Sequence, residues 1–271
     1  MNRIRGSSRP FAVIGDPVEH SLSPAMYNAA FAALGLDAVY VAIRTDPSAL
    51  PHMLRALESV GIAGNVTIPH KVAVANLLIR VTALAKELEA VNTFWPEGGR
   101  LVGDNTDVQG IIDVLEPLES ESPWIVSGTG GAARAVAAAA RELKASLLVG
   151  SRSRDREVNF VSWAQRLGVD CRPDDGSTVA TAVNATPLGL RQSDELPFAD
   201  RRLDGCRTAL DLVYAKGGTD WIRACTKRGM QAADGRSILV AQGVHAFKRF
   251  FPGLNPPKEV MAAAVERELS R

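Results

Sequence analysis

Hydrophobic and polar residues follow two periods along this chain, and together they predict a repeated order of strands and helices. Short apolar runs that end at Gly, Pro or Asp indicate buried strands, and longer segments with one apolar face indicate helices. In the N-terminal part this pattern predicts strands at 11–14, 38–43 and 62–66 and helices at 23–34 and 48–60. The alternation favours a sheet covered by helices.

The next segment departs from this alternation. Two short apolar runs, 90–95 and 100–102, are joined by Pro96-Glu97-Gly98-Gly99, a pattern typical of a β-hairpin. A helix is predicted over 106–115. Residues 116–123 are acidic, rich in serine and bounded by prolines, as is typical of a linker.

A second alternation of strands and helices follows. Repeated βα units of this length imply a parallel sheet with right-handed crossovers. The predicted strands are 124–126, 146–149, 178–184 and 208–212, and the predicted helices are 132–143, 156–167, 239–250 and 258–269.

Composition narrows the class of protein. The chain has 271 residues, 46% of them hydrophobic and 23% charged, and a formal net charge of +1, so no field of one sign favours nucleic acid or an acidic membrane. No apolar run approaches the roughly 20 residues that span a bilayer, and no secretory signal precedes the first strand. The three cysteines form no C-x-x-C pair, and the four histidines have no metal-ligand spacing. We expect a cytoplasmic protein with no metal and no nucleic-acid or membrane partner.

A glycine-rich loop stands between a predicted strand and an alanine-rich helix. Its sequence, Gly128-Thr129-Gly130-Gly131-Ala132-Ala133, fits the pattern G-x-G-x-x-A. Glycines let the backbone turn tightly and approach a pyrophosphate, and the helix N-terminus offers free N–H groups to the anion. The pattern predicts a dinucleotide site, and a tight structural turn is the alternative.

The loop after the next strand indicates which dinucleotide binds. An NAD site usually carries an Asp or Glu there to accept from the ribose hydroxyls. This chain has Ser151-Arg152-Ser153-Arg154 instead, with Arg156 close by. Because the guanidinium fork suits a 2′-phosphate, the position favours NADP(H) over NAD. A solvated basic loop is the alternative.

Two polar clusters suggest proton chemistry. Asn65-Val66-Thr67-Ile68-Pro69-His70-Lys71 follows the third strand, and Gly103-Asp104-Asn105-Thr106-Asp107 follows the hairpin. If the fold brings Lys71 and Asp107 together, they form an ammonium–carboxylate pair that can move a proton, and with a hydride carrier this is the minimum equipment of an alcohol dehydrogenase. The alternative is a surface salt bridge.

Other polar residues are ambiguous when taken singly. Ser21 and Ser23 lie at the predicted start of a helix, where hydroxyls and N–H groups can hold a carboxylate. Ser23 followed by Pro24 also fits a plain N-cap with proline at the first helical position. Asn92 and Gln242 could simply satisfy backbone groups.

The order of these pieces is more specific than any one of them. Along nearly its whole length the chain resembles the shikimate dehydrogenase family, whose members are NADP-dependent. The matching stretches are Gly15-Asp16-Pro17 with His20 to Pro24, Asn65 to Lys71, Ala90 to Thr93, Gly103 to Asp107, Gly128 to Ala133, Ser151 to Ser153, Asn184 to Pro187, Asp211 to Gly217 and Leu239 to Gln242.

The resemblance implies NADPH-linked, reversible reduction of 3-dehydroshikimate to shikimate, a step of aromatic amino acid and chorismate biosynthesis, by a monomer or homodimer. Lys71 and Asp107 match the catalytic pair of the family. The residues implied to bind the substrate are Ser21, Ser23 and Tyr214 for the carboxylate, and Asn65, Thr67, Asn92 and Gln242 for the ring hydroxyls and the reacting oxygen. The residues implied to bind the cofactor are Gly128, Thr129, Gly130, Gly131, Ala132 and Thr186, then Ser151, Arg152, Ser153 and Arg156 for the adenosine 2′-phosphate side, and Leu212 and Gly235 near the nicotinamide.

We therefore expect the α/β fold class with two domains. An N-terminal α/β substrate domain covers 1–104, and a Rossmann-type parallel-sheet NADP-binding domain covers 105–237. C-terminal helices over 238–271 return to the substrate domain, and a cleft lies between the domains. Because the chain crosses between them twice, we also expect a hinge.

The chain departs from the family pattern at a few positions. Tyr27 stands where histidine is frequent, Val108 where glycine is usual and Leu212 where methionine is common, and Ser237-Ile238 replaces a glycine–methionine step. None of these removes a group implied to be catalytic or to bind the carboxylate.

Several alternatives remain open. A quinate/shikimate or aminoshikimate dehydrogenase would use the same scaffold. A methylene-tetrahydrofolate dehydrogenase would need an aromatic residue near Lys71 to stack on a pterin, and none is evident. A non-catalytic NADP-binding sensor predicts loss of Lys71 or Asp107, and both are present.

Overall fold

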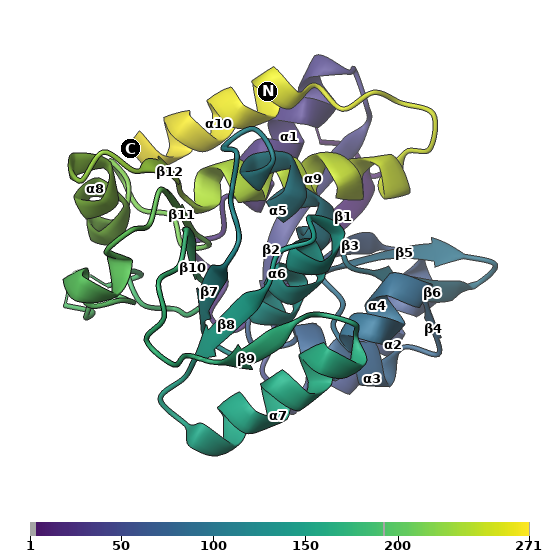
Figure 1. The fold of residues 1–271 in the computed structure, drawn as a ribbon. Coiled ribbons are helices and arrows are strands. Elements are labelled where there is room, and N and C mark those ends of the chain that lie inside the picture. The colour runs from purple at the N-terminus through teal and green to yellow at the C-terminus, as the bar shows by residue number, and fades with distance from the viewer. Residues whose placement is uncertain (1–3, 192, 271) are drawn as a thin grey trace. The chain divides into compact units, whose positions relative to one another are not determined.

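A computed structural model describes residues 4–191 and 193–270 and confirms the α/β class (Figure 1). Two compact units divide the chain. The first contains the residues up to Thr106 and the segment from Gln242 onward, and the second is Asp107–Ala241. Each unit is built on its own six-stranded sheet. The second division falls within one continuous helix, α9 (Gly235–Phe250).

The first unit contains a mixed sheet with the strand order β2-β1-β3-β5-β6-β4. β1 pairs in parallel with β2 and β3, and β4 pairs in parallel with β6, whereas β5 is antiparallel to both β3 and β6. The strands are β1 (Arg9–Gly15), β2 (Ala38–Arg44), β3 (Ala63–Val66), β4 (Arg80–Val81), β5 (Thr93–Glu97) and β6 (Arg100–Asp104).

Strand direction in this sheet gathers distant polar residues at one edge. Asn65 near the end of β3 pairs with Thr93 at the start of β5, and Thr93 pairs with Asp104 at the end of β6. Ile14 near the end of β1 pairs with Val66. The loops that follow β1, β3 and β6, and the residues just before β5, therefore meet at the same edge.

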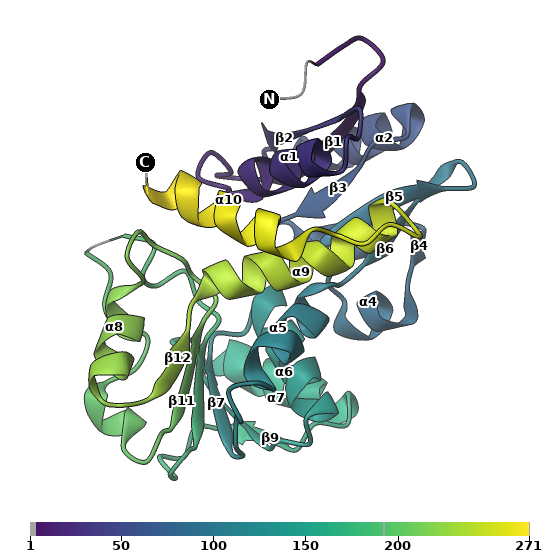
Figure 2. The ribbon, with the colours of Figure 1, turned by 90° about the horizontal axis from the view of Figure 1, so that it is seen from above.

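Helices cover both faces of the first sheet. Ile14, Val66 and Phe94 pack with the apolar side of α2, which includes Leu54 and Leu57. Neighbouring residues of β1 point to the other face, where Phe11 contacts Phe31, Phe250 and Phe251. α1 and α10 lie side by side (Figure 2). The helices are α1 (Ser23–Ala33), α2 (Leu50–Val60), α3 (Lys71–Leu77), α4 (Ala83–Leu88) and α10 (Lys258–Ser270).

The second unit contains a fully parallel sheet with the strand order β12-β11-β10-β7-β8-β9. With β7 counted as the first strand, this is the strand order of the dinucleotide-binding fold, and the order reverses between β7 and β10. The strands are β7 (Trp124–Ser127), β8 (Leu147–Gly150), β9 (Cys171–Pro173), β10 (Thr181–Asn184), β11 (Thr208–Asp211) and β12 (Gln231–Ala233).

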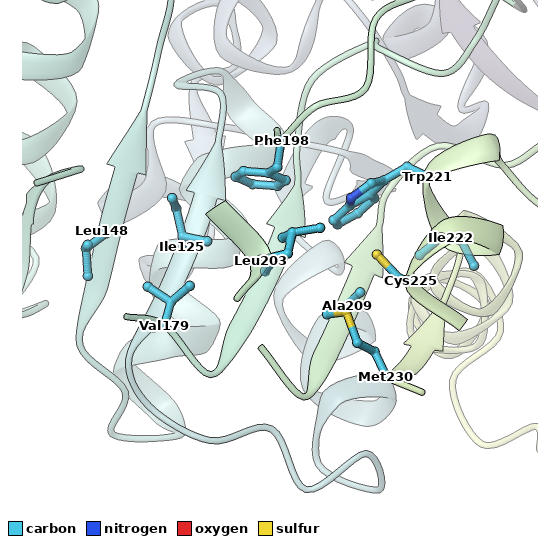
Figure 3. Packing of buried hydrophobic residues seen from close by; sticks show 11 residues of the cluster. Ile125, Leu148, Val179, Phe198, Leu203, Ala209, Trp221, Ile222, Cys225 and Met230 are labelled. Atoms are coloured by element: carbon cyan, nitrogen blue, oxygen red, sulfur yellow. The ribbon is translucent and has the colours of Figure 1, made fainter. Parts of the chain in front are cut away.

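The core on one face of this sheet joins strand residues to helix α8. Ile125 and Leu148 point from β7 and β8 toward the same layer as Phe198 and Trp221, whose rings lie 5.4 Å apart (Figure 3). Burial of an aliphatic or aromatic side chain contributes about 1.5–3 kcal/mol. The helices of this unit are α5 (Asp107–Leu115), α6 (Gly131–Glu142), α7 (Arg154–Arg166), α8 (Asp220–Lys227) and the short 3₁₀ helix Asp200–Leu203.

Some local features differ from the prediction. Residues 116–123, predicted as a linker, join α5 to β7 inside the second unit and do not connect the two units. β4, β9 and β12 were not predicted because each has only two or three residues, which is too short for a periodic signal. α3, α4 and α8 were also missed. No helix in the described part of the chain is long and apolar enough to cross a membrane.

Candidate active site

Lys71 opens helix α3, one short turn after the end of β3. Backbone bonds hold that turn: Thr67 N donates to Ile14 O at 2.9 Å, and His70 N donates to Thr67 O at 3.0 Å. The Lys71 carbonyl accepts from Val91 N at 2.9 Å, which ties the lysine to the segment before β5. The sheet edge therefore fixes where the Lys71 backbone lies.

The ring of His70 anchors the same turn. The side chain is 1% exposed, and Nε2 lies 2.6 Å from the carbonyl oxygen of Thr45. Because a carbonyl only accepts, Nε2 carries the proton in this contact. No sequence pattern singled out His70, which follows Ile68-Pro69 and precedes the lysine.

Beside this turn, a buried network of amides and hydroxyls joins β3, β5 and the end of β6. Asn65 Nδ2 donates to Thr93 Oγ1 at 2.9 Å and to the Asn92 carbonyl at 3.2 Å. Asn92 Oδ1 accepts from Thr106 N at 2.8 Å, and Asn92 Nδ2 lies 3.4 Å from Gln242 Oε1 on α9. The structure thus brings together three predicted substrate residues, Asn65, Asn92 and Gln242, and adds Thr93 and Thr106 to them.

Ser23 is not the N-cap of α1, and that prediction was wrong. The helix begins at Ser23, the N-cap position is Leu22, and no side chain caps it. The Ser21 hydroxyl instead accepts from Ser23 N at 3.3 Å, and no hydrogen bond to the Ser23 hydroxyl is found among the residues described. The local turn is therefore held without Ser23 Oγ, which leaves that oxygen for another role.

Asp107 begins helix α5 in the second unit and is 8% exposed. A carboxylate in the first turn of a helix is stabilised by the helix dipole. The residues that precede it belong to the first unit, where Asn105 Nδ2 donates to the Ala90 carbonyl at 3.0 Å. Asp104 accepts from Arg249 at 2.8 and 3.0 Å and from Thr82 at 2.6 Å. The approach to Asp107 is therefore anchored by Arg249 of α9, by Thr82 just before α4 and by the amide of Asn105.

The glycine-rich loop has the shape that a pyrophosphate needs. Gly128 has a φ of 111°, and a Cβ there would lie 2.9 Å from the Ala185 carbonyl oxygen, so only glycine fits. Gly130 is the N-cap of α6, and no side chain caps that helix. Its first N–H groups are therefore not covered by a capping side chain, and a dinucleotide phosphate suits the position.

The arginines after β8 differ in their partners. Arg154 is tied to Glu157 at 2.6 Å, and Glu157 is buried. Arg152 and Arg156 are exposed, and no ion pair of either is found in the described part of the chain. Ser153 Oγ caps α7 by accepting from Arg156 N at 3.5 Å, and Ser151 Oγ accepts from Ser153 N at 3.3 Å. The two arginines predicted to bind a phosphate are thus the two without an acidic partner.

The loops after β10 and β11 are joined by a buried carboxylate that the sequence analysis did not single out. Asp211 accepts from Asn184 Nδ2 at 2.8 Å, from Thr219 Oγ1 at 2.7 Å and from Val213 N at 2.9 Å. Burial raises the pKa of Asp211 to about 6, and these three hydrogen bonds oppose the rise. Both Asn184 and Asp211 end parallel strands, and that position was the signal that could have found them.

Three further predicted cofactor residues lie in the same loops. Asn184 Oδ1 accepts from Thr186 Oγ1 at 2.6 Å, so this hydroxyl shapes the turn. Leu212 N donates to the Asn184 carbonyl at 3.0 Å. A Cβ on Gly235 would lie 2.6 Å from the Leu212 carbonyl oxygen, so the contact between this loop and the start of α9 requires glycine.

Tyr214 lies half-buried in the loop after β11, in the second unit, whereas Ser21 and Ser23 belong to the first. No group of His, Cys, Asp or Glu side chains that could hold a metal ion occurs within residues 4–191 and 193–270.

A parallel sheet with the strand order of the dinucleotide-binding fold, together with a separate α/β unit that has a buried polar edge, is typical of two-domain dinucleotide-dependent enzymes. Comparison with known proteins narrows this class. Residues 13–94 match the family model described as the shikimate dehydrogenase substrate binding domain. The shikimate dehydrogenase (NADP(+)) of Trichormus variabilis is 37% identical over 285 residues, which cover 98% of this chain and 99% of that protein.

Solved structures agree with this match. A shikimate dehydrogenase in complex with NADP+ superposes with a TM-score of 0.89 at 30% identity, covering 99% of this chain and 98% of its own. The shikimate 5-dehydrogenase of Thermus thermophilus, solved with NADP(H) and shikimate, gives a TM-score of 0.86 at 34% identity, with 96% and 100% covered. The chain belongs to the shikimate dehydrogenase family.

Proposed function

We propose that this protein is an NADP-dependent shikimate dehydrogenase, which reduces 3-dehydroshikimate to shikimate reversibly in chorismate and aromatic amino acid biosynthesis. The observation that carries the proposal is the buried set of uncharged amides and hydroxyls around Asn65 and Asn92, at the sheet edge where Lys71 begins its helix. A polyol suits such a set because its hydroxyls both donate and accept. Membership in the family supports the same activity.

We assign the second unit to the cofactor, NADP(H). Gly128, Thr129, Gly130, Gly131 and Ala132 would hold the pyrophosphate at the N-terminus of α6. Ser151, Arg152, Ser153 and Arg156 would hold the adenosine 2′-phosphate, with Thr186, Leu212 and Gly235 along the nicotinamide side. When bound, NADPH supplies the hydride for the ketone carbon.

We assign the proton to Lys71. As the ketone carbon is reduced, negative charge develops on its oxygen, and the Lys71 ammonium stabilises this charge and donates a proton to it. The resulting neutral amine recovers its proton from water. Asp107 favours the charged form of the lysine and fixes its position. In the reverse direction, neutral Lys71 takes the proton of the substrate hydroxyl.

We assign the first unit to the substrate. Ser21 and Ser23 of the first unit, with Tyr214 from the loop after β11, would bind the ring carboxylate, and the availability of Ser23 Oγ supports this role. Asn65, Thr67, Asn92 and Gln242 would bind the ring hydroxyls and the reacting oxygen. We accordingly assign residues 1–104 to a substrate domain and residues 105–237 to a cofactor domain. Residues 238–271 are assigned to helices that return to the substrate domain.

We propose that the protein binds small molecules and has no nucleic-acid or membrane partner. We propose that the enzyme works in the cytoplasm, because all three cysteines are free thiols, as a reducing compartment keeps them. A monomer and a homodimer are both open, and sedimentation of the purified protein distinguishes them.

A two-by-two assay tests the function. Purified protein is given shikimate or quinate with NADP+ or NAD+, and the absorbance of the reduced cofactor is followed. We expect the highest kcat/KM for shikimate with NADP+. Turnover of quinate with NAD+ but not of shikimate would contradict both the substrate and the cofactor, and no turnover with any pair would favour the non-catalytic sensor.

A further inference from the structure

Two buried tyrosines lie behind the substrate edge of the first unit. The rings of Tyr27 and Tyr40 are stacked, with centroids 4.4 Å apart and planes inclined by 14°. Tyr40 OH donates to Asn65 Oδ1 at 2.7 Å, and Tyr27 OH donates to the Gly243 carbonyl at 3.2 Å. Burial raises the pKa of Tyr40 far above its usual value, so its hydroxyl keeps the proton that it donates.

The Asn65 amide has little hydrogen-bonding capacity left. A side-chain amide offers two N–H donors and two lone pairs on oxygen. Both donors of Nδ2 are used, by the Asn92 carbonyl at 3.2 Å and by Thr93 Oγ1 at 2.9 Å. One lone pair of Oδ1 is used by Tyr40. One lone pair of Oδ1 remains.

The orientation of this amide is set by its neighbours. Exchanging its oxygen and nitrogen would place Oδ1 against the Asn92 carbonyl oxygen, so that two acceptors would face each other. The same exchange would turn Nδ2 toward the Tyr40 hydroxyl, whose proton would then lose its acceptor in a buried position. Both changes leave a buried polar group unpaired, which costs about 1–3 kcal/mol.

The orientation of the Asn65 amide also sets the orientation of the Asn92 amide, through the hydroxyl of Thr93. Because Thr93 Oγ1 accepts from Asn65, its own proton is free to be donated to Asn92 Oδ1, 3.0 Å away. Asn92 Oδ1 also accepts from Thr106 N at 2.8 Å. Asn92 therefore turns Nδ2 toward Thr106 Oγ1 at 3.1 Å and toward Gln242 Oε1 at 3.4 Å. The orientations of both amides are thus set by internal partners, with Asn65 Oδ1 toward Tyr40 and Asn92 Oδ1 toward Thr93 and Thr106.

We propose that Tyr40 is a positioning residue: it fixes the Asn65 amide so that this site accepts a proton from one ligand hydroxyl and offers no donor. The inference rests on the proposed function, because it takes Asn65 to contact the substrate ring. The proposal predicts which chemical group can bind at Asn65. The group bound at Asn65 must be a hydroxyl that donates, and an ether or a ketone at that ring position is rejected.

Substrate analogues test the rule. Shikimate derivatives with one ring hydroxyl at a time replaced by hydrogen or by O-methyl are compared in kcat/KM. At one ring position we expect the deoxy and the O-methyl compounds both to lose about tenfold or more, since neither can donate. In Asn65→Ala the loss for the deoxy compound at that position should disappear, since no acceptor remains. A persistent loss in Asn65→Ala would overturn the proposal.

The variant Tyr40→Phe tests the positioning role. It removes the hydroxyl and keeps the stacked ring, so we expect KM for shikimate to rise about tenfold, with kcat and the KM for NADP+ changed less than about threefold. Thr181→Val is the control, because it removes a buried hydroxyl, which donates to the Glu121 carbonyl at 2.9 Å, from the second unit and leaves the bond from Tyr40 to Asn65 in place. An equal rise in KM for the two variants, at equal loss of thermal stability, would reduce Tyr40 to a structural role and overturn the proposal.

A measurement on the wild-type protein covers the case in which Tyr40→Phe does not fold, or in which shikimate is not turned over. In ¹⁵N-labelled protein the two Nδ2 protons of Asn65 should exchange slowly with water and stay protected when shikimate binds, because their partners are internal. Rapid exchange without ligand, or displacement of these bonds by shikimate, would show that the amide is not locked. Failure of the proposed function would instead appear as absent shikimate turnover with the protons still protected.

Discussion

At the edge of the first sheet the polar side chains are bonded to one another, whereas the edge of the second sheet presents glycine backbone and exposed arginines. Asn65 and Asn92 are buried and share hydrogen bonds with Thr93 and Thr106. By contrast, Gly128 and Gly130 contribute backbone alone, and Arg152 and Arg156 are exposed. The first edge is built for fixed hydrogen-bond polarity, and the second for close approach and charge.

The difference suits the two ligands proposed above. A small polyol has few atoms, so discrimination needs donors and acceptors that cannot reorient, which burial and saturation provide. A dinucleotide carries charged phosphates, so a helix N-terminus and guanidinium groups suffice without a rigid side-chain network. We therefore expect mutations at the two edges to impair different properties of the protein.

The largest effect should come from Lys71→Ala. Loss of the group assigned to proton transfer should lower kcat about 10²–10⁴-fold, with a smaller change in KM for shikimate. Steady-state kinetics measures both. Lys86→Ala, an exposed lysine of α4, is the control and should retain full activity. If Lys71→Ala kept more than a tenth of the wild-type kcat, Lys71 would not be the proton donor.

Gly128→Ala should damage the second edge through its backbone. The added Cβ would enter a left-handed conformation and approach the Ala185 carbonyl, so we expect a loss of about 3 kcal/mol in unfolding free energy and weaker NADP+ binding. Gly130→Ala is the control for the stability measurement only, because the φ of Gly130 is −85° and an added Cβ would meet open space. Equal melting temperatures for the two variants would contradict this assignment of strain.

Thr93→Val should damage the first edge through its side chains. It preserves shape but leaves an Asn65 N–H without its acceptor in a buried site, which should cost about 2 kcal/mol of unfolding free energy. Chemical denaturation measures it. Thr226→Val, an exposed position on α8, removes a hydroxyl that bonds only the Ile222 carbonyl and should cost far less. A similar cost for both would mean that the buried network is not saturated.

Charge removal at the second edge should have a selective effect. Arg152→Ala or Arg156→Ala should raise the KM for NADP+ about tenfold and leave the KM for NAD+ unchanged, because only NADP+ carries the 2′-phosphate. Arg154→Ala, whose guanidinium is tied to Glu157, serves as the control with a smaller change. A parallel rise for both cofactors would indicate loss of the loop and not of a phosphate contact.

The smallest effect, when counted per pH unit, concerns the carboxylate that joins the loops after β10 and β11. Because the pKa of Asp211 is raised from 3.8 to about 6, the folded state binds its proton more tightly than the unfolded state does. Stability from this group is therefore present below about pH 4 and declines as pH rises toward 6, by about 1 kcal/mol per pH unit.

Thermal melts at pH 4, 5 and 6 compare the wild type with Asp211→Asn, in which this slope should vanish. Asp175→Asn is the contrast, because hydrogen bonds from Ser177 lower the pKa of Asp175 to about 2, and its contribution lies below this pH range. An unchanged slope in Asp211→Asn would assign the pH dependence to other groups.

Much of the fold follows from local pattern. The strands at 11–14 and 124–126 and the helices at 48–60 and 258–269 were predicted to within a few residues, because each carries a clear period or turn signal. Strands of two or three residues were not, since they exist only through pairing with a neighbour. Ser23 was misassigned as an N-cap because the local signal of Ser followed by Pro does not reveal that the helix begins one residue earlier.

The residues of the candidate site likewise divide into those that the sequence predicted and those that it did not. Residue types and their order pointed to a lysine, two amides, a glycine loop and a phosphate-binding loop. Family resemblance assigned them roles, which the proposed experiments test. Tyr40 and Thr93 carried no such signal, because a buried tyrosine or threonine in a strand is common, and Asp211 carried only its position at the end of a parallel strand. Their importance comes from partners far away in sequence.

The sequence by itself determined the α/β class, the place of the glycine-rich loop and the family, because these depend on periodicity and on short motifs in order. Only the tertiary structure decided the hydrogen-bond polarity of the substrate edge. The strand register opposes Asn65 to Thr93 and Thr93 to Asp104, and the fold brings the Tyr40 hydroxyl to Asn65 Oδ1. Which atom of an amide faces a ligand is settled by the neighbours that use up its other atoms, and those neighbours meet only when the sheet is formed.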